Sequence, residues 1–178
     1  MPTLPKTFHS LKQTFLYDGE FLTGKWSNNT EYVINAGDLD LIETPNTVME
    51  LTANDYDEIY GEILNERICE SLPLAWSITI KSPEPGLSHL FKNRPLYIQV
   101  IRGGRTVTLA EMKITYMDKR QGIIHLEKVH APPNFIPDKL TLAKNLPNYD
   151  EDLERLLDTC AESRRNFFDN HLKINESK

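Results

Sequence analysis

The side chains best suited to chemistry include two histidines and a glutamate that lie close together in the sequence. On a strand, His125 and Glu127 would share one face, while His130 lies beyond them in a proline-rich stretch. A metal site needs three or four converging ligands, so this spacing favours a surface strand and we predict no metal site. Acidic residues of the first half, such as Asp38 and Asp55, mark turns, which favours solvated carboxylates over an acid–base pair.

No familiar catalytic or phosphate-binding signature occurs in the sequence. It has no Gly-x-Ser-x-Gly, P-loop, Gly-x-Gly-x-x-Gly or His-Glu-x-x-His pattern. Arg102-Gly103-Gly104-Arg105 is typical of a hairpin tip, and Arg105, Lys119 and Arg120 could form a small basic end that contacts an acidic partner. We therefore predict neither an enzyme nor a cofactor. An enzyme whose site is assembled from dispersed residues remains an alternative, because such sites are built by the fold.

Length and charge set the broad class of protein. The chain has 178 residues and a net charge of -6, which fits one acidic domain and argues against nucleic acid as a partner. No apolar run approaches the roughly 20 residues of a membrane span, and the first residues lack the apolar core of a secretory signal. We expect a cytoplasmic protein that binds no membrane. The sequence leaves open whether Cys69 and Cys160 pair or remain free buried thiols.

Apolar residues alternate with polar ones as far as residue 129, which predicts a mainly β protein. The predicted strands cover residues 11–17, 20–26, 32–34, 39–42, 47–53, 58–64, 74–81, 96–102, 106–117 and 122–129. Short strands at regular spacing indicate an antiparallel up-and-down barrel or a β-sandwich, here of about ten strands with one C-terminal α-helix.

Three local features of these strands are specific enough to check. Asp18-Gly19 predicts a tight hairpin turn between the first two strands. A slip in the apolar phase near Ala110-Glu111 predicts a β-bulge. In the strand over residues 74–81, four alternating residues are predicted to lie in the core: Leu74, Trp76, Ile78 and Ile80.

From residue 148 the apolar spacing becomes helical, and one helix is predicted over residues 148–173. Residues 147–178 would then be a helix and frayed tail that pack on a barrel-like domain of residues 1–146, plugging an open end or covering an edge strand. Arg164 interrupts the apolar stripe before Phe167 and Phe168. Because a cation beside aromatic side chains is common in interfaces, these three residues are predicted to lie against the barrel or in a dimer contact.

Residues 22–29, LTGKWSNN, resemble the first strand of the avidin family, in which Gly-x-Trp leads into a polar turn that contacts the ligand. The predicted hairpin over residues 49–64 is similar to the barrel tips of that family, and lipocalin-type barrels share an early Gly-x-Trp. The resemblance implies a calycin-type barrel in which Trp26 and Asn28 contact a ligand, with the next polar ligand position near Tyr32.

The sequence allows two interpretations of the two tryptophans. Trp26 and Trp76 could form the floor of a ligand pocket, because such pockets are mostly apolar. Alternatively, both are core residues. The leading hypothesis is a non-catalytic binding protein whose barrel holds a small, partly apolar ligand or a peptide segment. The alternative is an interaction or assembly module, including a homo-oligomer, that uses the C-terminal helix or an edge strand.

Overall fold

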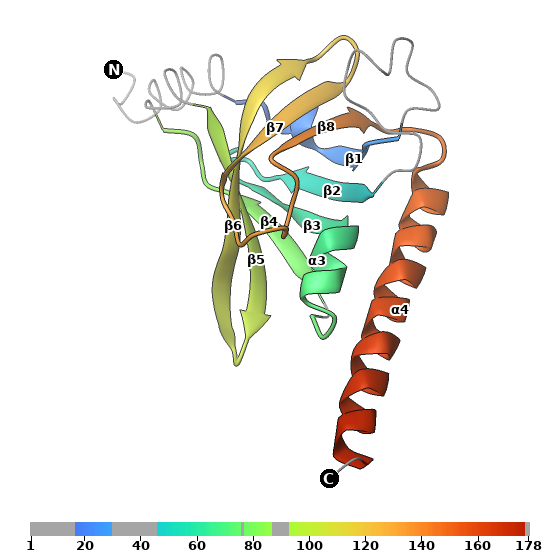
Figure 1. Cartoon of the computed structure of the whole chain (residues 1–178). Helices are drawn as coiled ribbons and strands as arrows, with labels where there is room; N and C mark the ends of the chain where they lie inside the picture. Colours follow the sequence, from blue (N-terminus) through green and yellow to red (C-terminus); the bar gives the residue numbers. More distant parts are fainter. Residues whose placement is uncertain (1–16, 30–45, 76, 87–92, 177–178) are drawn as a thin grey trace, which may run out of the picture.

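The computed structural model describes residues 17–29, 46–75, 77–86 and 93–176. Eight antiparallel strands follow one another around a closed barrel, and β8 pairs back to β1 (Figure 1). The strands are β1 Gly24–Ser27, β2 Thr47–Ala53, β3 Ile59–Asn65, β4 Ile78–Ser82, β5 Arg94–Arg102, β6 Arg105–Asp118, β7 Ile123–His130 and β8 Lys139–Lys144. The predicted mainly β fold with a C-terminal helix is confirmed, as a closed barrel with eight described strands instead of about ten.

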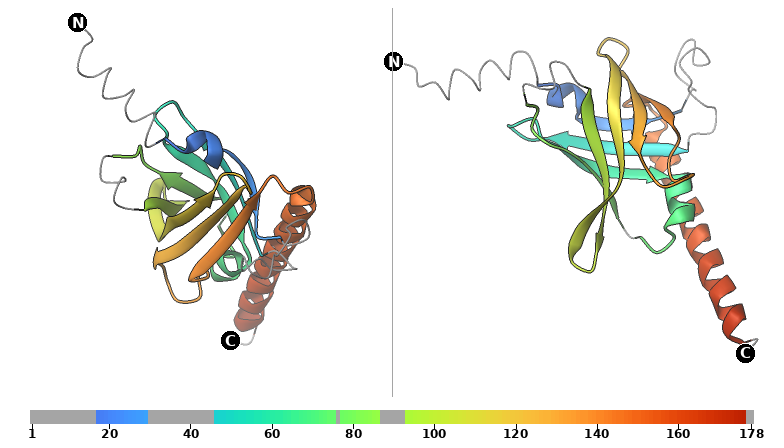
Figure 2. Two further views of the ribbon diagram at one scale, coloured as in Figure 1. Left: turned by 90° about the horizontal axis from the view of Figure 1, so that it is seen from above. Right: turned by 60° about the vertical axis from the view of Figure 1, so that its left-hand side comes forward.

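Within the described residues, three helices accompany the barrel. The short helices α2 (Gly19–Leu22) and α3 (Glu66–Ser71) lie at opposite ends of it, and the long α4 (Tyr149–Glu176) runs along its outside and projects past the α3 end (Figure 2). Asn65 caps α3 by accepting hydrogen bonds from the backbone N–H groups of Arg67 and Ile68. Cys69 therefore lies in a helix that the sequence analysis did not predict.

The barrel interior is filled by alternate side chains of every strand. In β2, for example, Met49 and Leu51 point into the core, while Val48 points outward to α4. The same alternation places Ile80, Leu96 and a further set of inward residues in one apolar cluster. That cluster also contains Ala110, Met112, Ile114, Ile124, Leu126, Leu140 and Leu142. One continuous core of this kind fits a single closed barrel.

The predicted β-bulge is confirmed in β6. Ile98 pairs with Ala110, whereas Gln99 pairs with Thr108, so Leu109 is an extra residue on the β6 side. Towards β7 the register shifts twice, between Glu111 and Met112 and between Ile114 and Tyr116. Bulges increase local bending, and β6 is a strand of 14 residues that contributes to both neighbouring pairs.

The hairpin predicted at Asp18-Gly19 is wrong. The chain forms helix α2 there, and the backbone N–H groups of Asp18 and Gly19 donate to the carboxylate of Asp57 from the β2–β3 turn. A contact across the barrel end thus overrides the local turn preference. The predicted strands over residues 32–34 and 39–42, and most of the one over 11–17, lie outside the described residues.

The strand predicted over residues 74–81 begins late. Leu74 lies in a turn and is 49% exposed, so its predicted core position is wrong, and β4 starts only at Ile78. The turn follows from α3, because the chain leaves that helix at Leu72 and turns back through Pro73. Ile80 is buried in the core as predicted, and Ile78 is partly buried against it. Trp76 lies outside the described residues.

Helix α4 covers the outer wall formed by β1, β2 and β3, and neither plugs an end nor covers an edge strand. Tyr149 and Leu156 pack with Val48, and Leu64 and Leu153 border this contact. Burial, together with the negative charges of nearby carboxylates, raises the pKa of the Tyr149 phenol to about 12. The neutral Tyr149 side chain serves as an apolar anchor for the helix.

Candidate functional site

Trp26 of the Gly-x-Trp stretch is completely buried at the α2 end of the barrel. Its indole Nε1 donates to the carbonyl of Leu22 at 2.8 Å, and the Phe21 ring meets it edge-on at 5.5 Å. The Lys144 ammonium lies 5.8 Å from the centre of the Trp26 ring and donates to the carbonyl of Phe21. Gly24 has φ +139, and a Cβ there would come within 2.8 Å of the Lys144 side chain, so glycine is required.

Asn28 is buried, and its side-chain amide forms hydrogen bonds with another segment of the chain. Its Oδ1 accepts from the backbone N–H groups of Asn46 and Thr47, and its Nδ2 donates to Asn46 Oδ1 at 2.9 Å. The next residue, Asn29, donates to the buried Asp152 of α4 at 2.9 Å. Of the predicted ligand residues, the structure thus places Trp26 and Asn28 in protein contacts on and beside β1. Tyr32 and Trp76 lie outside the described residues.

Two buried, oppositely charged residues form an ion pair at the α2 end, and the sequence analysis did not predict this pair. The guanidinium of Arg94 contacts the Asp57 carboxylate and its backbone carbonyl, and its Nε donates to Ser82 at 2.9 Å. Asp57 has φ 59, the left-handed region. The positions are 37 residues apart in sequence, and Arg94 follows a proline-rich loop, so no local pattern signals the pair.

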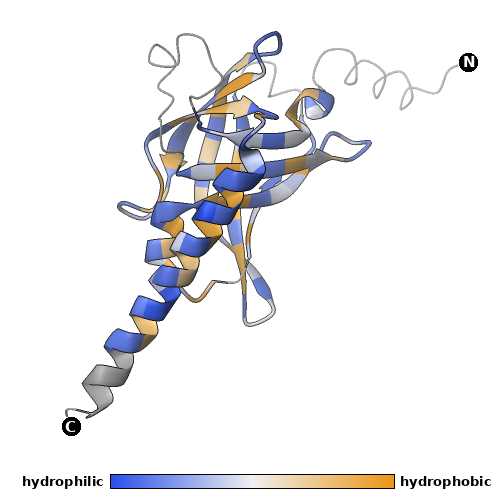
Figure 3. Cartoon of the chain, turned by 90° about the vertical axis from the view of Figure 1, so that its right-hand side faces the viewer, coloured by the Kyte–Doolittle hydropathy of each residue, from blue (hydrophilic) through white to orange (hydrophobic). Residues whose placement is uncertain are grey.

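At the α3 end, α4 and the hairpin of β5 and β6 both project beyond the barrel (Figure 3). An apolar groove lies between them. Its volume is about 390 Å³. The floor is the segment of residues 71–75, one wall is the hairpin, and Phe167 of α4 forms the other. The hairpin residues that line it are Val100, Ile101, Arg102, Val107 and Leu109.

The rim of this groove exposes large apolar side chains. Ile101 is 69% exposed, Val107 42%, and Leu74 at the floor 49%. Phe168, next along α4, is 49% exposed, and its ring meets the Phe167 ring at 5.9 Å. Apolar groups that gather around one hollow mark a candidate binding surface.

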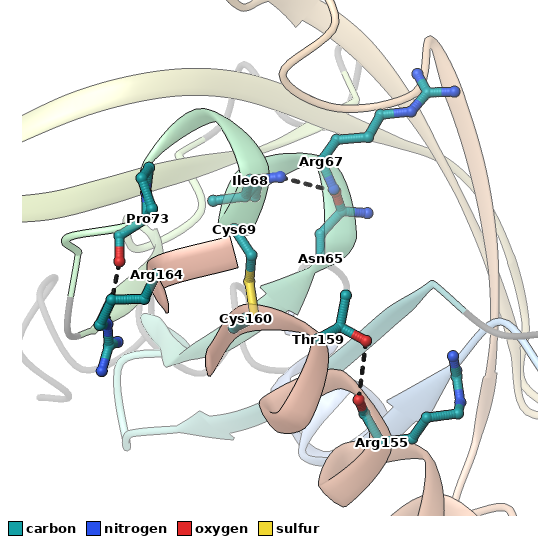
Figure 4. The surroundings of a disulfide bond; sticks show 9 residues. All are labelled: Asn65, Arg67, Ile68, Cys69, Pro73, Arg155, Thr159, Cys160 and Arg164. Atoms are coloured by element: carbon teal, nitrogen blue, oxygen red, sulfur yellow. Dashed lines mark hydrogen bonds between the residues drawn. A yellow bond between two sulfur atoms is a disulfide. The ribbon is translucent and has the colours of Figure 1, made fainter. Parts of the chain in front are cut away.

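A second, smaller hollow of about 160 Å³ adjoins the groove between α3 and α4. Leu72, Pro73 and Ala75 line both hollows. Beside them, Cys69 and Cys160 form a disulfide, and Arg164 donates from Nε to the Pro73 carbonyl at 3.1 Å (Figure 4). The structure therefore brings two of the predicted interface residues, Arg164 and Phe167, against the segment of residues 71–75.

The charges that line these hollows are positive. Arg102 lines the groove and Arg164 lines the smaller hollow, and none of the described residues that line either one is a carboxylate. Arg105 pairs with Arg102 in register at the hairpin tip. The basic end predicted from Arg105, Lys119 and Arg120 is divided, because Lys119 pairs with Asp18 at the opposite end of the barrel at 2.6 Å.

His125 and Glu127 lie on the outer barrel surface, and each interacts with a different residue of a neighbouring strand. His125 Nδ1 lies 2.8 Å from Thr141 Oγ1, and the hydrogen bond and charge of Lys113 lower the pKa of the Glu127 carboxyl. Within the described parts of the chain, no three His, Cys, Asp or Glu residues gather as metal ligands would. Of the helices in those parts, none is long and apolar enough to cross a membrane.

In comparisons with known proteins, no protein family, curated protein or solved structure matches the chain. The fold itself, an eight-stranded antiparallel closed barrel, is compatible with the calycin-type architecture that the Gly24–Trp26 stretch resembles.

Proposed function

We propose that this protein is a non-catalytic binding protein that holds an apolar peptide segment of a partner protein in the groove between α4 and the β5–β6 hairpin. The observation that carries the proposal is the groove itself, whose apolar lining comes from three separate elements. Its volume of about 390 Å³ falls within the range of ligand-binding clefts. The exposed Ile101 and Val107 would lose contact with water when such a segment binds, which stabilises the complex.

Charge narrows the chemistry of the bound segment. The chain is acidic overall, yet among the described residues the charged side chains that line the groove and the adjoining hollow are Arg102 and Arg164. A segment with an acidic residue beside its apolar ones would therefore be favoured over a basic one. Complementary charge of this kind contributes chiefly to specificity and to the rate of association.

The groove is a better candidate than a ligand site at Trp26 and Asn28. Both side chains are buried, and their hydrogen-bonding groups contact the chain itself. These contacts support a structural role at the α2 end.

We also infer that the barrel is of calycin type. Two features support this inference: the positive φ of Gly24, and the packing of Trp26 beneath Lys144.

Selection from a library of displayed random peptides tests the proposed function. Peptides enriched on the immobilised wild type should be apolar with an acidic residue, and Val107→Asp should weaken their binding by about tenfold or more, because it puts a charge in an apolar wall. Val129→Asp is the matched control, since Val129 is 53% exposed on β7 and does not line the groove. Failure to enrich any peptide, or equal loss in both variants, would contradict the proposal.

A further inference from the structure

We propose that the Cys69–Cys160 disulfide is a redox-sensitive latch that holds the α4 wall of the groove, so that reduction weakens binding there. This inference rests on the proposed function and names how the same site is regulated. The bond joins α3 to α4 across 91 residues of sequence, with the two Cα atoms 5.0 Å apart (Figure 4).

The first half of α4 is held by anchors that do not involve the disulfide. Tyr149 and Leu156 are buried against Val48 on the barrel wall. The Asp152 carboxylate, also buried, accepts hydrogen bonds from Ser27 and Asn29. These contacts keep the start of the helix on the barrel whether or not the disulfide is present.

The second half of α4 is more exposed than the first: Tyr149, Asp152 and Leu156 are buried, whereas residues 161–170 are exposed or only half-buried. Beyond Cys160, Arg164 bonds to the Pro73 carbonyl, and Phe167 lines the groove. Residues 161, 162, 165, 166 and 168–170 are exposed. A helical segment that buries little apolar surface is marginal in water. The disulfide is the covalent tie between this part of α4 and α3, and it thereby holds Phe167 beside the groove.

The disulfide is accessible to an attacking thiolate. Cys69 is buried, but Cys160 is only half-buried, and both line the hollow of about 160 Å³ that opens to the surface. Arg164, one helical turn beyond Cys160, lines the same hollow. A nearby cation favours the thiolate form of a cysteine, and accessible disulfides are the more readily reduced ones.

Reduction requires a dithiol of a thiol–disulfide exchange partner. Its first thiolate attacks Cys160 Sγ, the Cys69–Cys160 bond breaks, and Cys69 leaves as a thiolate that takes up a proton. The second thiol of the partner then attacks the mixed disulfide and releases Cys160, which is protonated in turn. Two electrons pass from the dithiol, which becomes a disulfide, to the cysteine pair.

Amide hydrogen exchange of the full chain, oxidised or treated with dithiothreitol, tests the latch without any peptide. On reduction, residues 161–170 should lose protection, while residues 149–156 and the barrel strands keep theirs. In parallel, the affinity for a peptide selected on the oxidised protein should fall by about tenfold, the effect of losing one aromatic wall. Unchanged exchange over residues 161–170, or equal or tighter peptide binding after reduction, would overturn the latch.

Variants separate the latch from general destabilisation. Cys69→Ser/Cys160→Ser should behave like the reduced wild type and no longer respond to dithiothreitol. Lys25→Ala removes the exposed Lys25–Asp150 ion pair at the start of α4 and should keep the full redox response. If reduction unfolds the barrel together with α4, the bond is a global staple and the latch is wrong.

The two proposals fail in different ways. In one case, residues 161–170 lose protection from amide exchange on reduction, but no peptide can be selected. This result would overturn the proposed function, and the redox response of the helix would remain as a conformational change alone. A peptide that is lost with Val107→Asp but binds equally in both redox states would overturn only the latch.

Discussion

The two ends of the barrel bury and expose their side chains in opposite ways. At the α2 end, Trp26 lies beneath Lys144, and Arg94 is paired with Asp57, so large and charged groups are both buried with partners. At the α3 end, Ile68 joins the core, but apolar side chains remain outside it around the groove. We therefore expect the α2 end to stabilise the barrel and the α3 end to provide the proposed binding surface.

The largest expected effect is at Trp26, which among the described residues is the largest side chain that is completely buried. Trp26→Ala should lower the free energy of unfolding by about 3–5 kcal/mol, because it leaves a cavity that the rigid barrel fills poorly. Urea denaturation monitored by far-UV circular dichroism measures the loss. A loss below about 1 kcal/mol would show that this end is not the stabilising one.

Asp57→Asn should have the next largest effect, a loss of about 3 kcal/mol, because it leaves the Arg94 guanidinium buried without its counter-charge. Asparagine tolerates the left-handed backbone at this position, so the loss should report the charge and not strain. The double variant Asp57→Asn/Arg94→Met, measured by the same denaturation, should recover part of the loss. A double variant no more stable than Asp57→Asn alone would argue against an electrostatic origin.

The smallest expected change in stability is at the α3 end. Ile101→Asn should alter the free energy of unfolding by less than about 0.5 kcal/mol, because the Ile101 side chain is 69% exposed and leaves no cavity. The same variant should weaken binding of a groove-selected peptide, measured by isothermal titration calorimetry. A large loss of stability with unchanged binding would reverse the proposed roles of the two ends.

Much of the barrel could be read from local periodicity. The strand predicted over residues 47–53 coincides with β2, and the one over 58–64 is β3 shifted by one residue, because each has a clear inward and outward face. The phase slip in β6 located the bulge, since an extra residue changes the face of every later side chain. The helix predicted over residues 148–173 is α4, Tyr149–Glu176.

The missed elements lack such a period. β8 was not predicted, because four consecutive residues of it, 140–143, are buried and show no alternation. Helix α3 has only 6 residues, and its cap, Asn65, is also the last residue of β3. Short elements of this kind depend on their neighbours more than on their own sequence.

The sequence by itself determined the class of fold, the bulge, the long helix and the aromatic pair at its second half, because alternation and helical spacing are local properties of the chain. Tertiary structure alone decided that Asp57 meets Arg94, that Cys69 meets Cys160, and that Phe167 faces the β5–β6 hairpin. Each of these contacts joins residues that are far apart in the chain. Barrel closure and the path of α4 over β1–β3 bring these residues together in space, and no local sequence pattern predicts either feature.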